Sequence, residues 1–231
     1  MKNKFSLKKI LILVTVLAVP GFLYYLLQEK GKNRYRPLAI YGPKQVAATF
    51  HTKRGVKIPD TIYHTISDFG LVNQVGDSVL FPPDSSQITV VNFFFSRCTS
   101  VCPLMNEQMA RIAAAYPDNR LIKLYSISVD PEHDTPAALA AYAERYKADP
   151  RKWSFLTGKK DYIYTLAKKD FLVDAMKDSA GNIVHSSMLI LVDPKKRIRG
   201  YYESTRKEQV DKLIDEIKVQ IAEELRQVTD R

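Results

Sequence analysis

The sequence predicts an α/β domain with a parallel sheet at its core and antiparallel strands at its edges. Apolar, β-branched segments alternate with helical patterns through the middle of the chain, as they do in βα units. Residues 88–95 are apolar at nearly every position, which is expected of a strand covered on both faces. Hairpin patterns precede and follow the alternating part. Together these observations predict the fold class.

The basic charge lies at one end of the chain. The net charge is +10, and residues 1–36 hold +7 of it, because they contain eight basic residues and one acidic residue. The other 195 residues therefore carry only +3. Nucleic-acid binding requires basic residues clustered on a folded face. The sequence shows no such cluster and no recognition motif, so we expect no nucleic-acid partner.

Residues 10–27 are predicted to be a single transmembrane anchor. The segment has 18 residues and no charge, close to the length of about 20 apolar residues that a membrane span requires. Tyr24 and Tyr25 suit a headgroup boundary. A cleaved signal peptide is the alternative, although its apolar core is usually shorter. With residues 1–9 in the cytoplasm, the folded domain is expected on the periplasmic side of the cell membrane.

Residues 28–59 are predicted to be a linker, because Gly and Pro recur there without a sustained period. An irregular arm packed on the domain is the alternative. The folded domain is expected over residues 60–226, with a tail at 227–231. It begins with a hairpin around residues 73–77, which ends at Pro82-Pro83.

The remaining elements follow from periodicity and from the residues that begin and end them. Thr135 and Pro136 suit the N-cap and the first position of a helix. The predicted strands are 88–95, 121–129, 153–156, 188–192 and 198–202; the predicted helices begin at Pro103, Thr135, Lys160 and Thr205, and a turn is expected at 178–182.

Cys98 and Cys102 are the only two cysteines, and they lie where a buried strand is predicted to give way to a helix. At this spacing the two Cα atoms can fall within disulfide range. Such a short loop gains little stability from a disulfide. A helix N-terminus beside the sulfurs favours thiolate, which is both a nucleophile and a metal ligand. The pair is therefore predicted to be redox-active and metal-binding.

Two sulfurs do not fill a metal shell, and two of the four histidines are placed to add a ligand. His133 follows the second predicted strand, and His185 precedes a strand that should run antiparallel to its core neighbour. Both should lie at the sheet edge that carries the cysteines, so the pattern leaves the choice open. Sulfur and imidazole ligands suit copper, although zinc accepts them too. An iron–sulfur cluster is excluded, because it requires four cysteines.

Three segments resemble the SCO/SenC family of copper proteins of cytochrome c oxidase assembly: FFFSRCTSVCP, SISVDPEHDTPAALAAY and VHSSMLILVDPKKRIRGYY. The resemblance covers about residues 60–222. It implies a thioredoxin-like three-layer fold with an N-terminal β-hairpin. It also implies copper ligands Cys98, Cys102 and His185, with Asp130 in the outer shell. Asp130 also suits a strand-ending turn. Thr99 departs from the family, which usually has Pro after the first cysteine.

The expected function is that of a membrane-anchored copper metallochaperone, not an enzyme in the strict sense. The resemblance implies that its partners are a copper-carrying subunit of cytochrome c oxidase and a periplasmic copper donor or thiol reductant. One alternative is a thiol–disulfide reductase acting on the cysteines of an oxidase subunit or of a copper chaperone. Another is a peroxidase-like enzyme, in which one cysteine attacks peroxide and the other resolves the product.

Overall fold

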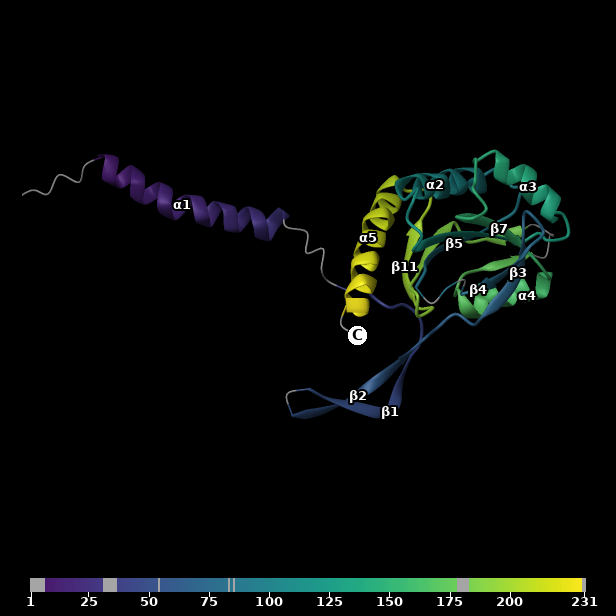
Figure 1. Ribbon diagram of the computed structural model, residues 1–231, viewed down its shortest axis with the longest axis horizontal. Coiled ribbons are helices and arrows are strands. Elements are labelled where there is room, and N and C mark those ends of the chain that lie inside the picture. Colours follow the sequence, from purple (N-terminus) through teal and green to yellow (C-terminus); the bar gives the residue numbers. More distant parts are fainter. Residues whose placement is uncertain are drawn as a thin grey trace, which may run out of the picture. The chain divides into compact units, whose positions relative to one another are not determined.

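The computed structural model describes residues 7–30, 37–53, 55–82, 84, 86–177 and 183–229. The chain divides into two compact units, residues 1–36 and 37–231. The first unit contains helix α1 (Leu7–Lys30). The second contains every other element that the structure describes (Figure 1).

Helix α1 covers the segment predicted to be an anchor, and its large apolar side chains between Leu11 and Tyr25 are exposed. Within the described part of the chain, no helix meets the combined length and hydropathy expected of a membrane span. The transmembrane role predicted for residues 10–27 is therefore not confirmed.

The predicted linker contains a β-hairpin, so the expectation of an irregular segment over residues 28–59 is wrong for its second half. Strands β1 (Lys44–Lys53) and β2 (Val56–Tyr63) pair antiparallel as a separate two-stranded sheet. Figure 1 shows this hairpin apart from the main sheet. The pairing continues at its base, where the backbone N–H of His64 donates to the carbonyl of Pro43 over 3.1 Å.

The main sheet has seven strands in the order β11-β10-β5-β6-β7-β3-β4. Strands β5, β6 and β7 are parallel, whereas β10 and β3 flank them antiparallel. The predicted parallel core with antiparallel edges is confirmed. The strand bounds are β3 Phe69–Asn73, β4 Ser78–Phe81, β5 Ile88–Phe94, β6 Ile122–Ser128, β7 Trp153–Thr157, β10 Met188–Val192 and β11 Ile198–Glu203.

Helices cover both faces of this sheet, which makes three layers (Figure 1). Successive side chains of a strand point to opposite faces. Val90 of β5 therefore packs in one core cluster with helices α2 (Val101–Ala115), α3 (Pro136–Glu144) and α5 (Lys207–Thr229). Val91 packs in the other cluster with helix α4 (Lys160–Thr165) and the π-helical turn η1 (Leu166–Asp170). Both clusters are buried, as the apolar strand β5 predicts.

Most predicted element boundaries agree with the structure to within a few residues. Thr135 is the N-cap of α3, and its Oγ1 accepts from the backbone N–H of Ala138 over 3.3 Å. Helix α2 begins at Val101 and not at Pro103, which places Cys102 in the first turn. The turn expected at residues 178–182 lies outside the described residues. It falls between β8 (Ala175–Lys177) and β9 (Ile183–His185), which form a separate two-stranded sheet.

Candidate metal and redox site

Both cysteines lie beyond the carboxyl end of β5. Cys98 lies on the cysteine loop, residues 95–100, which leads from β5 into α2, and Cys102 lies in the first turn of α2. The backbone N–H of Cys98 donates to the carbonyl of Phe95 over 3.2 Å, which closes the turn before the helix. The backbone N–H of Cys102 then donates to the Cys98 sulfur over 3.4 Å. The two cysteines form no disulfide, and both residues are buried. The first turn of α2 therefore directs at the Cys98 sulfur an N–H group that has no acceptor within the helix.

The pKa values of the two thiols are shifted in opposite directions. Burial alone would raise the pKa of Cys98, but hydrogen bonds from the thiol and backbone of Cys102 and from Ser100 outweigh it and lower the pKa to about 6. Burial raises the pKa of Cys102 far above its ordinary value, and the Cys98 sulfur and the Asp134 carboxylate raise it further. At neutral pH the site therefore holds one thiolate, on Cys98, beside one protonated thiol.

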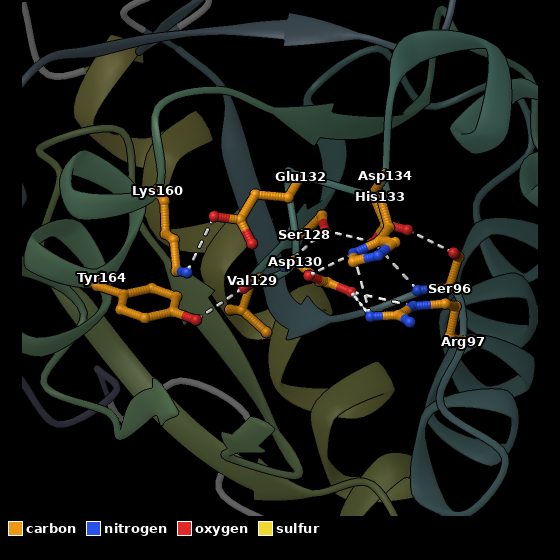
Figure 2. A network of polar contacts seen from close by, with 10 residues as sticks. All are labelled: Ser96, Arg97, Ser128, Val129, Asp130, Glu132, His133, Asp134, Lys160 and Tyr164. Atoms are coloured by element: carbon orange, nitrogen blue, oxygen red, sulfur yellow. Dashed lines mark hydrogen bonds and ion pairs between the residues drawn. The ribbon is translucent and has the colours of Figure 1, made fainter. Parts of the chain in front are cut away.

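Asp134 ties the cysteine loop to the sheet and was missed by sequence reasoning. Its buried carboxylate accepts from the backbone N–H of Ser96 over 3.1 Å and from the Ser96 hydroxyl. The Ser128 hydroxyl at the end of β6 also donates to it (Figure 2). In the sequence, Asp134 directly precedes the helix-capping Thr135, so its pattern suggests turn chemistry alone. In the fold it joins two neighbouring strand ends.

Asp130 holds the residue that precedes the first cysteine. Its buried Oδ2 accepts from Arg97 Nη2 over 2.6 Å and Nε over 3.2 Å, while Oδ1 lies 3.1 Å from His133 Nδ1 (Figure 2). Burial would raise the pKa of Asp130, but the hydrogen bonds from Arg97 and His133 outweigh burial and lower it. Asp130 therefore supports the cysteine loop through Arg97.

The histidines fall into distinct settings. His133 is half exposed and is engaged with Asp130 and Arg97. His51 pairs with Asp60 on the β1–β2 hairpin, and His64 bonds the carbonyl of Asp170. These three histidines are thus each engaged with groups other than the cysteines. The backbone of His185 ends strand β9, while its side chain lies outside the described part.

The topology brings the backbone of His185 to the same edge of the sheet as the cysteines. Strand β10 is antiparallel to β5, with Ile190 opposite Val91 and Val192 opposite Thr89. The start of β10 therefore lies at the carboxyl end of β5. His185 precedes that start by three residues, and Cys98 follows the end of β5 by four. The antiparallel direction predicted for β10 is confirmed.

One further backbone hydrogen bond extends the β8–β9 hairpin at its base. The backbone N–H of Ser186 donates to the carbonyl of Asp174 over 3.0 Å, one step beyond the pairing of Ala175 with His185. A cavity of about 590 Å³ borders this base, and Asp174, Ser186 and Met188 line part of it. Met188 begins β10 and packs against the buried core.

A buried polar network lies below the cysteines, one helical turn further along α2. Asn92 Nδ2 donates to Asn106 Oδ1 over 3.0 Å, and Asn106 Nδ2 donates to the Tyr142 hydroxyl over 3.1 Å. Ser126 Oγ donates to Asn92 Oδ1 over 2.6 Å and accepts from Trp153 Nε1 over 2.8 Å. Buried hydrogen-bonded amides specify one packing arrangement. They therefore fix the position of α2 on the sheet.

Among the side chains that the structure describes, no group of three His, Cys, Asp or Glu residues is close enough to hold a metal ion. The donor set visible there consists of the two cysteine sulfurs. The backbone of His185 lies at the same sheet edge, and its side chain is outside the described part of the chain.

A three-layer α/β domain with a dithiol at a helix N-terminus belongs to the thioredoxin-like class. A family model described as SCO1/SenC matches residues 59–222, more than half of the chain, and the chain belongs to this family. The predicted family is confirmed.

The relatives share about a quarter of their residues with the chain. The SCO1 protein homolog of Bacillus subtilis is 28% identical over 167 residues, which are 71% of this chain and 86% of that protein. A solved structure of BsSco has a TM-score of 0.62 at 26% identity, and the match covers 69% of this chain and 94% of the BsSco chain. BsSco is described as a member of the Sco family of cytochrome c oxidase assembly proteins with a disulfide switch. The structure of copper-bound ScoI of Bradyrhizobium japonicum has a TM-score of 0.54 at 26% identity. The match covers 64% of this chain and 97% of the ScoI chain.

Proposed function

We propose that this protein is a copper metallochaperone that binds copper through the sulfurs of Cys98 and Cys102 and the imidazole of His185. The supporting observation is the pair of buried cysteines, not joined in a disulfide, at the start of α2, where a backbone N–H donates to the Cys98 sulfur over 3.4 Å. The relatives add support, because one solved structure is that of a copper-bound ScoI.

The donor chemistry fits copper as cargo. Thiolates are soft ligands that select Cu(I), and imidazole accepts both copper oxidation states. Cys98 is already a thiolate at neutral pH, because its pKa is lowered to about 6. Cys102 has a raised pKa and loses its proton only when the metal binds. Copper uptake therefore releases about one proton from the pair near pH 7.

The proposed recipient is the copper centre of a cytochrome c oxidase subunit. This part of the proposal rests on family membership and on the description of BsSco as an oxidase assembly protein. The dithiol must be reduced before it can bind copper, so a copper donor and a thiol reductant are the expected partners. Oxidation of the pair to a disulfide would remove both sulfur ligands and stop loading.

A thiol–disulfide reductase is the second candidate, favoured by the asymmetry of the two thiols. The Cys98 thiolate would attack one sulfur of a target disulfide and release a target thiolate. Cys102 would then attack the mixed disulfide, which leaves a Cys98–Cys102 disulfide and a fully reduced target. A low-pKa attacking cysteine and a buried resolving cysteine suit this sequence of steps. His185 has no part in it.

Copper loading of the reduced full chain tests the proposed ligands. The wild type should retain stoichiometric Cu(I) through a desalting column, whereas Cys98→Ala should not. His185→Ala should bind more weakly in a competition with a Cu(I) chelator. His133→Ala is the matched control, because His133 lies at the same sheet edge but is engaged with Asp130. Full copper retention by Cys98→Ala, or equal affinity of the wild type and His185→Ala, would contradict the ligand set.

Oxidase assembly in cells separates the two candidate functions. A metallochaperone should fail with either His185→Ala or Cys102→Ala, and added copper should partly restore His185→Ala. A reductase should fail only with the cysteine variant. Normal assembly with His185→Ala and none with Cys102→Ala would therefore favour the reductase.

Membrane attachment through residues 10–27 and a periplasmic position of the folded domain remain predictions from the sequence. The uncharged apolar segment supports them. Fractionation of cells, with protease added to intact spheroplasts, measures both. The expected result is a membrane-bound chain whose folded domain is cleaved from outside.

A further inference from the structure

The β1–β2 hairpin has a surface that the copper-binding proposal does not use. All of β1 and the start of β2 precede the matched family region, residues 59–222. The hairpin forms its own two-stranded sheet and adds no strand to the seven-stranded one. An isolated two-stranded hairpin is marginally stable in water. A surface that covers it would therefore stabilise it.

Large apolar side chains are exposed on both faces of this hairpin. Phe50 is opposite Pro59, so its side chain shares a face with Pro59 and Lys57. Val56 and Ile58 point to the other face. Phe50 is 55% exposed, Val56 62% and Ile58 37%. These three residues lie in the half of the hairpin nearest its turn. Val46 and Ile62, in the other half, are also exposed, so apolar side chains are exposed along the whole hairpin, including around its tip.

The hairpin also carries an excess of positive charge. Residues 44–63 contain four basic residues and one acidic residue, Asp60. Asp60 is engaged by His51 Nδ1 at 2.7 Å, which leaves the basic residues in excess. The Lys57 ammonium lies 4.6 Å from the centre of the Phe50 ring, and the Lys44 ammonium lies 5.7 Å from that of Tyr63. Such cation–aromatic pairs place a positive charge directly beside an apolar group.

We propose that the tip of the β1–β2 hairpin docks on the surface of an anionic lipid bilayer. Basic side chains are attracted to anionic headgroups, and apolar side chains beside them enter the boundary between headgroups and acyl chains. A fluid bilayer can surround a tip that is apolar on both faces. A protein surface, or a second copy of this chain, covers one face of a hairpin and leaves the other in water. The two-faced exposure therefore favours lipid.

The Phe50→Trp variant of the full chain reports directly on the position of the tip. The one native tryptophan, Trp153, is buried and supplies a constant background. The chain is incorporated into vesicles made of equal parts phosphatidylcholine and phosphatidylglycerol, with bromine on the acyl chains as a contact quencher. We expect the emission of the introduced tryptophan to shift to the blue and to be quenched, and added salt to reverse both effects.

Two variants control this measurement. Leu80→Trp places tryptophan at an exposed position on the edge strand β4, away from the hairpin, and should show no quenching. Lys57→Ala in the Phe50→Trp background should weaken the lipid-dependent signal about fivefold, since one basic residue near an anionic surface contributes about that factor.

Three results would overturn the proposal. The first is quenching of Phe50→Trp no greater than that of Leu80→Trp. The second is equal quenching in vesicles of phosphatidylcholine alone, which would exclude recognition of anionic lipid. The third is a blue shift that grows with protein concentration in the absence of lipid, which would assign the surface to a second copy of the chain. None of these readouts depends on copper binding.

Discussion

The cysteine loop and the β8–β9 hairpin meet the same edge of the sheet but are held in different ways. Buried Asp134 and Asp130 tie the loop to the ends of β5 and β6, and α2 presents an N–H group to Cys98. The hairpin that ends at His185 is a sheet of its own, and the described backbone bond at its base, from Ser186 to Asp174, lies between its own two arms. The comparison teaches that the two proposed sulfur donors are held by contacts to the main sheet and to α2, whereas the proposed imidazole donor belongs to a separate two-stranded sheet.

The largest expected contrast lies within the cysteine loop. Iodoacetamide should alkylate Cys98 along a pH profile with a midpoint near 6, because thiolate forms as the pH rises through the lowered pKa. Cys102 should react more slowly by roughly a thousandfold at neutral pH, since its raised pKa and burial suppress thiolate. Mass spectrometry of the alkylated peptides measures both rates.

Cys102→Ala sharpens this comparison. It removes the thiol that hydrogen-bonds Cys98 but keeps the backbone N–H, so the Cys98 midpoint should move upward without reaching that of an ordinary cysteine. A midpoint that stays near 6 would assign the lowered pKa of Cys98 to the backbone N–H groups and to Ser100, without a contribution from the Cys102 thiol.

Removal of Asp134 should have the next largest effect. Asp134→Ala leaves the Ser96 N–H and two hydroxyl groups without their buried acceptor, so the free energy of unfolding should fall by about 3 kcal/mol. Urea denaturation followed by circular dichroism measures this change. The matched control is Asp174→Ala at the base of the β8–β9 hairpin, where the residue is exposed and bonds through its backbone carbonyl. Equal losses in the two variants would contradict the role assigned to the Asp134 carboxylate.

Asp130 should give the smallest effect, visible mainly as a pH dependence. Its pKa is lower in the folded protein than its ordinary value of 3.8. Its stabilisation is therefore fully present above the unfolded value and is lost as the pH falls through the folded one. Asp130→Asn should lower stability by about 1 kcal/mol at neutral pH. It should also lose less stability on acidification than the wild type does. Denaturation measured from pH 2 to 7 gives the free energy of unfolding as a function of pH. Parallel curves for the wild type and Asp130→Asn would contradict this role.

The sequence predicted much of this site because its signals are local. The nearly continuous apolar run of β5, the cap at Thr135 and the cysteine spacing each reflect chemistry between near neighbours, and all three agree with the structure. Asp134 was not found, because its partners Ser96 and Ser128 lie in other segments. Only the resemblance distinguishes His185 from His133 as the proposed third ligand, because the predicted strand order places both histidines at the sheet edge that carries the cysteines.

The β1–β2 hairpin was mistaken for a linker for a physical reason. A strand in a sheet that covers a core alternates between apolar and polar residues, and this alternation is the usual signal. Val56 and Ile58 do alternate with Lys57 and Pro59 in β2, but Gly55 and Pro59 are signals of a turn or loop and favour a linker. Neither face of the hairpin covers the core of the domain, and its apolar side chains are exposed.

The X-ray absorption spectrum of the Cu(I)-loaded chain, recorded for the wild type and for His185→Ala, tests the central claim most directly. The account predicts two sulfur scatterers and one imidazole nitrogen in the wild type. In His185→Ala the same two sulfurs should remain and the imidazole signal should be lost. Identical spectra of the two proteins, or a wild-type shell with fewer than two sulfurs, would contradict it.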